Sequence, residues 1–247
     1  PKVRLFDGIC HRNIKDLIPF VIFLIRQVNL RENSLESEIS SAGEQLLVNL
    51  FKIHPEATFA QVKAFIKENK DASDLQTIYT IMICICGISS VSFIRPDFIK
   101  LLTKANKFLT KFQDSIIDLA KRPYQPLALV ALCAIDNLIT ALNLFVTKEG
   151  LKKLLSLREC INFQTSQFVQ LLLKIFRDFG CIKDAISKNS GDCWEEVIGL
   201  FNSLIEFALK GTTDQDIVKD VIECFTIWIE KLALFKTTHQ AFIELAM

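Results

Sequence analysis

Four lysines recur at helical spacing near the middle of the chain: Lys100, Lys104, Lys107 and Lys111. At about 100° per residue these positions fall within a narrow arc of a helix, with apolar residues roughly opposite. Ammonium groups in a row can hold an acidic protein segment or a phosphate backbone. They can equally form an ordinary solvated helix face, and both interpretations stay open. Lys121 and Arg122 could extend this lysine stripe.

Asp136, Thr140 and Asn143 interrupt the most apolar stretch of the chain. They are spaced i, i+4 and i+7, so they share one helix face. The three side chains could line a groove and hydrogen-bond to the backbone of a bound partner. Alternatively, they could satisfy loop amides or one another inside the fold, as buried polar groups usually do.

Residues for nucleophilic or metal chemistry are sparse. The three histidines lie far apart, at positions 11, 54 and 239, without cysteine or acidic residues at ligand spacing. Cys84 and Cys86 would point to different faces of a helix, so they do not form a metal clip. No phosphate-binding loop, dinucleotide-binding glycine motif or His-Glu-x-x-His motif occurs. The sequence therefore predicts a protein that is not an enzyme, with no cofactor and no metal site.

The composition favours long helices. Hydrophobic residues make up 50% of the 247 residues, mean hydropathy is +0.31, and only 8 Gly and 6 Pro are present. Few turn residues and no alternating strand pattern indicate helices joined by short loops. We therefore expect an all-α protein.

The cysteines and the apolar runs indicate the cellular compartment of the protein. Most of the eight cysteines lie within apolar helical runs, and no glycosylation sequon occurs, so we expect an intracellular protein, cytoplasmic or nuclear, with free thiols. No signal peptide is visible. The stretch 127–146 contains several polar residues, which favours a buried central helix over a membrane span. Because the chain starts at Pro1, we expect a segment of a longer protein.

Helix boundaries can be read from capping signals. Thr58 with Gln61, Ser73 with Gln76 and Asp192 with Glu195 have the spacing of capping boxes. Pro96 and Pro126 suit a first helical turn, and Gly211 suits a C-terminal cap. These signals predict about ten or eleven helices: 12–29 with a kink or restart at Pro19, 34–53, 58–69, 74–89, 96–120 with a break near Asn106, 126–146, 149–157, 165–188 with a break at Gly180, 193–210, 214–234 and 238–246.

One segment carries a repeat-like pattern. A helix closes with Ala131, Ala134, Ile135, Asn137 and Leu138, and a new helix opens with Gly150, Leu154 and Leu155. Leu46–Leu50 match again with Asn49 at the Asn position, and Ile83–Ile88 match with Gly87 instead. This pattern resembles armadillo- and HEAT-like helical repeats.

The resemblance implies a right-handed α-solenoid, in a single domain over 1–247, with Asn49 and a partly accessible Asn137 lining a groove. In the peptide-binding branch of that family a Trp stands one turn before the Asn. Here Gln45 and Cys133 take its place, so binding of nuclear localisation signals is not implied.

A solenoid presents a surface for other macromolecules. The sequence thus favours a scaffold or adaptor that binds a partner helix or extended peptide, with an acidic peptide suited to the lysine stripe. Nucleic-acid binding through the basic patch is an alternative, although the net charge is only +1. A homo-oligomerising structural element is the other alternative.

Overall fold

The computed structural model describes residues 2–27, 35–90, 99–182, 185–186, 193–211 and 215–233. Over these residues the chain is helical and contains no strand, which confirms the all-α prediction. The chain divides into two compact units, Pro1–Phe112 and Gln113–Met247. The expected single repeat domain over 1–247 stays a prediction.

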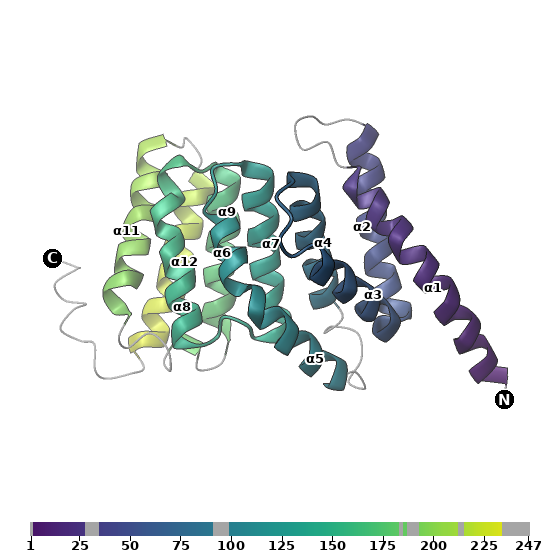
Figure 1. The fold of residues 1–247 in the computed structure, drawn as a ribbon. Helices are drawn as coiled ribbons and strands as arrows, with labels where there is room; N and C mark the ends of the chain where they lie inside the picture. The colour runs from purple at the N-terminus through teal and green to yellow at the C-terminus, as the bar shows by residue number, and fades with distance from the viewer. Residues whose placement is uncertain are drawn as a thin grey trace. The chain divides into compact units, whose positions relative to one another are not determined.

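The first unit contains five α-helices in its described part and one short 3-10 segment. They are α1 (Lys2–Arg26), α2 (Leu35–Ile53), α3 (Pro55–Glu68), α4 (Leu75–Ser90), α5 (Ile99–Leu109) and η3 (Thr110–Phe112). Helix α1 packs along α2 and also contacts α3 and α4 (Figure 1). Its core positions are spaced i, i+4, i+7 and i+11, and all are buried: Ile14, Ile18, Val21 and Ile25. This stripe is what an amphipathic helix needs to dock on its neighbours.

A glycine allows α2 and α4 to approach closely. A Cβ built at Gly87 would lie 3.0 Å from Cε2 of Phe51 and 3.3 Å from Cδ2 of Leu47. Phe51 and Leu47 are fully buried. The glycine that replaces the expected Asn at position 87 is therefore a packing residue, in an environment different from that of the exposed Asn49.

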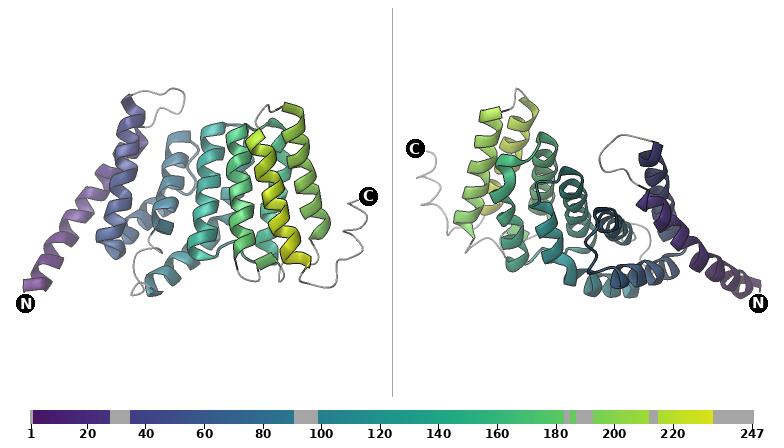
Figure 2. Two further views of the ribbon diagram at one scale, coloured as in Figure 1. Left: turned by 180° about the vertical axis from the view of Figure 1, so that it is seen from behind. Right: turned by 45° about the horizontal axis from the view of Figure 1, so that its top comes forward.

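The second unit contains α6 (Gln113–Ala120), α7 (Gln125–Leu142), α8 (Lys148–Leu155), the 3-10 helix η4 (Ser156–Phe163), α9 (Ser166–Cys181), α11 (Trp194–Gly211) and α12 (Gln215–Ala233). Helices α7, α9 and α12 lie side by side, with α9 between the other two (Figure 2). A second row consists of α6, α8, η4 and α11, in which α8 contacts the other three and α11 also contacts η4. Helix α6 contacts α7 of the first row, and α11 contacts α12. The unit is thus two rows of helices.

The second unit is held at its C-terminal end by an aromatic cluster. The Trp228 ring is fully buried, and ring centroids of Phe176 and Phe179 lie 5.8 Å from it. The indole Nε1–H donates to the Phe176 carbonyl at 3.0 Å, which satisfies the only polar atom of the side chain. This cluster joins α9 to α12.

Helix α7 ends in a left-handed turn that leads into α8. Asn143 has φ 51° and ψ 26°, and its N–H donates to the Ile139 carbonyl. Phe145 also has a positive φ of 67° and is buried. Thr147 then caps α8 by accepting the Gly150 N–H at 3.0 Å. A Cβ at Gly150 would lie only 2.3 Å from the Phe145 carbonyl oxygen, so this position requires glycine.

Several predicted boundaries were wrong for local reasons. Helix α3 begins at Pro55, and Thr58 lies inside it, where its hydroxyl donates to the Leu50 carbonyl. The cap of α4 is Asp74, whose carboxylate accepts the Thr77 N–H at 2.8 Å, and Ser73 is not the cap.

Two predicted helices also have different extents. The segment predicted at 96–120 consists, from residue 99 on, of α5, η3 and α6, and α1 starts well before residue 12 and continues through Pro19. The signals at Pro96 and Asp192 and the helix predicted at 238–246 lie outside the described residues.

Helix α7 is long and apolar enough to cross a membrane by length and composition. In the second unit, however, 56% of this apolar window is buried inside the molecule. The central helix of a helical core has the same composition.

Candidate functional site

The lysine stripe lies on α5 and η3 of the first unit. Leu101, Ala105, Phe108 and Leu109 are buried, and they fix which face of α5 turns inward. All four lysines consequently point outward and are exposed. Lys100, Lys104 and Lys107 belong to α5, whereas Lys111 lies in η3. The helix changes type at Thr110, four residues after the break expected near Asn106.

The four ammonium groups have no carboxylate within ion-pair distance among the described residues. Some other lysines in the described part of the chain are paired: Lys153, for example, lies 2.8 Å from an Asp114 carboxylate oxygen. Unpaired like charges in one row repel one another, and an anionic partner would relieve that repulsion.

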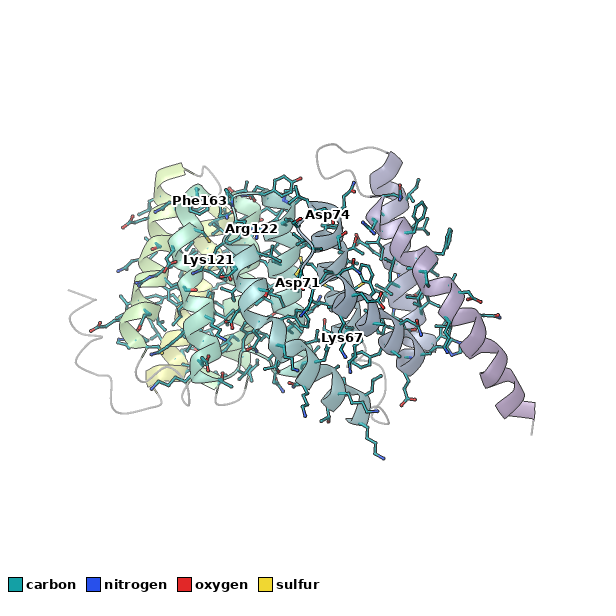
Figure 3. The ribbon with its side chains drawn as sticks, viewed as in Figure 1. Lys67, Asp71, Asp74, Lys121, Arg122 and Phe163 are labelled. Carbon is teal, nitrogen blue, oxygen red and sulfur yellow. The ribbon has the colours of Figure 1, made fainter. Side chains whose placement is uncertain are left out.

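Helix α3 adds positive charge beside the stripe. The Phe59 and Phe108 rings meet edge to face at 6.3 Å, which places α3 against α5. Lys63 Nζ lies over both rings, 5.6 Å and 5.5 Å from their centroids. Lys67, one turn further along α3, is exposed (Figure 3). The basic surface therefore spans two helices of the first unit, and sequence spacing alone gave no sign of the α3 contribution.

Lys121 and Arg122 belong to the second unit (Figure 3). Lys121 Nζ is 3.0 Å from an exposed Glu159 carboxylate oxygen, so its charge already has a partner. Asn49 lies in the first unit with the stripe, as an exposed residue of α2. The candidate residues of α7 lie in the second unit.

Asp136 of α7 forms part of a charged cluster with α9. Lys174 Nζ donates to Asp136 Oδ2 and, at 3.0 Å, to Asp178 Oδ2. The other oxygen of Asp136, Oδ1, is buried and has no hydrogen-bond partner among the described residues. Burial raises the pKa of Asp136, against the opposing effect of Lys174, and the nearby Asp178 carboxylate raises it further. The two ion-paired acids thus share one lysine.

The remaining members of the predicted polar face have separate local roles. The Thr140 hydroxyl donates to the Asp136 carbonyl at 2.9 Å within the same helix. Asn143 forms the left-handed cap described above, and both side chains are exposed. Asn137 is half-buried on α7, in agreement with the partial accessibility expected for it.

The charged face continues from α9 to α12. Arg177 Nη1 lies 4.0 Å from carboxylate oxygens of Asp220 and Glu223, and Lys219 Nζ lies 3.9 Å from Glu223. Sequence analysis missed these residues and Lys174, because the partners on different helices lie 38 or more residues apart. The i, i+4 spacings of Lys174 with Asp178 and of Lys219 with Glu223 were the local signals available.

The described cysteines offer little nucleophilic chemistry. Burial raises the pKa of the Cys160 thiol to about 11 and that of Cys224 to about 12, so both are protonated at neutral pH. Burial likewise raises the pKa of Cys84. Within the described ranges, no group of three or more His, Cys, Asp or Glu residues is arranged to hold a metal ion.

Comparison of the chain with protein-family models, with curated proteins and with solved structures gave no match. The geometry of the chain's own residues is therefore the basis for any functional argument. The lysine stripe is the candidate site in which unpaired charge, exposure and a defined helical spacing occur together.

Proposed function

We propose that this chain is a non-enzymatic helical-repeat module that binds an acidic helical segment of a protein partner along the lysine stripe. The observation that carries the proposal is the row of four exposed lysines without carboxylate partners among the described residues. A module of this kind acts as a scaffold or adaptor.

The packing within each unit supports the repeat part of the proposal. In the second unit α6 contacts α7 and α11 contacts α12, while α9 contacts both α7 and α12, so the helices form a continuous stack. Such a succession is what an α-solenoid of the armadillo or HEAT type uses to build an extended surface.

The spacing of the lysines indicates the form of the partner segment. The positions follow i, i+4, i+7 and i+11, and they cover about 16 Å of helix length. An acidic helix with carboxylates at the same intervals presents one anion to each lysine. Single-stranded nucleic acid would also need exposed aromatic rings for base stacking, whereas Phe108, the aromatic residue of α5, is buried on the inward face.

The test uses a labelled synthetic helical peptide with glutamates at i, i+4, i+7 and i+11, and a scrambled peptide of equal charge. We expect the spaced peptide to bind more tightly, and Lys104→Glu with Lys107→Glu to abolish binding in a salt-dependent way. The matched control reverses two other exposed lysines of the first unit, Lys52→Glu with Lys70→Glu, and should retain binding.

Thermal melting should be nearly the same for both double variants, because exposed substitutions usually change stability by about 0.5 kcal/mol or less. Equal affinity for the spaced and scrambled peptides, or equal loss in both double variants, would count against the proposal. Tighter binding of duplex DNA than of the spaced peptide would favour the nucleic-acid alternative.

A further inference from the structure

Helix α1 exposes two aromatic side chains outside its core stripe. Phe20 is 53% exposed and Phe23 is 57% exposed, whereas the Ile and Val positions of the core stripe are buried. Large apolar side chains that remain in water side by side commonly mark an interaction surface. This face lies on a different helix from the lysine stripe, and an inference about it is independent of the proposed function.

A pocket of about 420 Å³ adjoins the Phe23 ring. Its lining comes from the last turns of α1 and the first turn of α4: Pro19, Ile22, Phe23, Arg26, Gln27 and Gln76. Phe20 is not part of the lining. A protruding ring and a pocket thus lie next to each other on one helix.

Charges of opposite sign flank the aromatic pair. Asp16 lies one turn before Phe20, and Arg26 lies about one turn after Phe23, both exposed. The two charged residues are ten positions apart, about 15 Å along a helix, so they cannot pair within one chain. Neither has an ion-pair partner within 4.0 Å in the described part of the chain, although Asp74, the cap of α4, and Arg26 attract each other over a longer distance.

We propose that a second copy of this chain docks on this exposed face of α1. The two α1 helices then lie antiparallel, and the two-fold axis between them passes at the height of residue 21 along the helix. Along α1 the exposed residues follow the order acid, aromatic, aromatic, base. An antiparallel second copy presents the reverse order, so that each acid faces a base and the aromatic pairs face each other. Each Asp16 therefore lies opposite Arg26 of the second copy, and Phe20 of each copy packs into the pocket of the other. An interface between identical surfaces of this kind is the isologous contact of a two-fold dimer.

The register avoids like charges. Pairing about residue 21 places Lys15 opposite Gln27 of the second copy, which is neutral. The contact involves little more than one helix face, smaller than a standard interface, so the dimer dissociates on dilution. Sedimentation velocity between about 1 μM and 1 mM covers the relevant range.

Charge exchange tests the antiparallel register. Asp16→Arg alone and Arg26→Asp alone each place two like-charged pairs in the homodimer, and we expect each to weaken self-association by roughly tenfold or more. The double variant restores both ion pairs. An equimolar mixture of the two single variants also restores them, as a heterodimer, and we expect it to associate about as well as the unchanged chain.

The aromatic contribution has its own control. Phe20→Ser with Phe23→Ser should abolish self-association, whereas Ile53→Ser, which removes an apolar side chain that is 66% exposed on α2, should leave it unchanged. Circular dichroism melting checks that each variant is folded. A chain that stays monomeric throughout the concentration range, or single variants whose mixture does not associate, would overturn the proposal.

Discussion

At the scale of single residues, the two members of the Asp136–Lys174 ion pair are expected to differ in how much their removal destabilises the fold. Asp136 is half-buried, one of its oxygens has no hydrogen-bond partner in the described part of the chain, and burial raises its pKa. Lys174 serves two carboxylates, Asp136 and Asp178. Removal of the lysine leaves two like charges together, whereas removal of one acid leaves a simple pair.

We predict that Asp136→Asn changes the free energy of unfolding by less than about 1 kcal/mol at pH 7, because the lost attraction is offset by the burial cost of the charge. Lys174→Met should cost about 1–3 kcal/mol, since Lys174 is 44% exposed and solvent screens part of the effect. Urea unfolding measures both values.

The pH dependence distinguishes repulsion from lost packing in the Lys174→Met variant. A group whose folded pKa is raised binds protons more readily in the folded state, so its contribution is complete below the unfolded pKa and is lost as the pH rises through the folded pKa. The deficit of Lys174→Met should therefore shrink as the pH falls from 7 through the raised folded pKa of Asp136 towards about 4, the usual aspartate pKa. A deficit that does not vary with pH would mean that packing, and not carboxylate repulsion, is responsible.

Asp74 has the opposite sign. The Thr77 backbone N–H holds the pKa of this carboxyl below its usual value. Its stabilising contribution is thus present above about pH 4 and is lost as the pH falls through the lowered folded pKa. We predict that Asp74→Ala costs about 1 kcal/mol at pH 7 and less near pH 3, as measured by urea unfolding. Asp74→Ser, which keeps a capping oxygen without a titrating carboxyl, should cost only a few tenths of a kcal/mol at pH 7 and should be at least as stable as the unchanged chain near pH 3.

At the scale of elements, sequence periodicity was sufficient for most helices but not for their contacts. The spacing of buried apolar positions predicted α2, α4, α9 and α11 to within a residue or two at the N-terminal end, because that spacing is local information. The lysine stripe was predicted for the same reason. The Asp136–Lys174 pair and the pocket between α1 and α4 join distant segments, so no local pattern encodes them.

Capping signals were less reliable than periodicity. Thr58 has the spacing of a capping box, but the fixed φ of Pro55 starts the helix three residues earlier. The Thr58 hydroxyl then bonds to the Leu50 carbonyl at the end of the preceding helix. Two side chains with the spacing of a capping box therefore mark a helix start only when no residue before them already starts the helix.

The junction between α7 and α8 supplies a prediction at this scale. Gly150→Ala should cost about 1–3 kcal/mol, because its Cβ would meet the Phe145 backbone at 2.3 Å. Gly199→Ala is the matched control within α11. Its tight contact is with the end of the flexible Arg158 side chain, which can move aside, so this variant should be neutral or slightly stabilising. Thermal or urea unfolding compares them, and similar costs would refute the close-approach explanation.

At the scale of the whole molecule, each compact unit buries its own set of apolar side chains. Leu47 and Phe51 are buried in the first unit, whereas Leu172 and Trp228 are buried in the second. Both tryptophans of the chain, Trp194 and Trp228, belong to the second unit. Tryptophan fluorescence therefore reports on that unit, while far-ultraviolet circular dichroism reports on the helices of both.

This placement of the tryptophans gives a test of cooperativity. In repeat proteins stability is a sum of local and nearest-neighbour contributions, so units with separate cores can unfold at different denaturant concentrations. We predict that Leu47→Ala, which removes about 2–5 kcal/mol from the first unit, shifts the circular dichroism transition to lower urea and leaves the fluorescence transition in place. Leu172→Ala should shift both. If Leu47→Ala moved the two transitions together, the chain would unfold as one cooperative stack over 1–247, as the sequence pattern predicts for a single repeat domain.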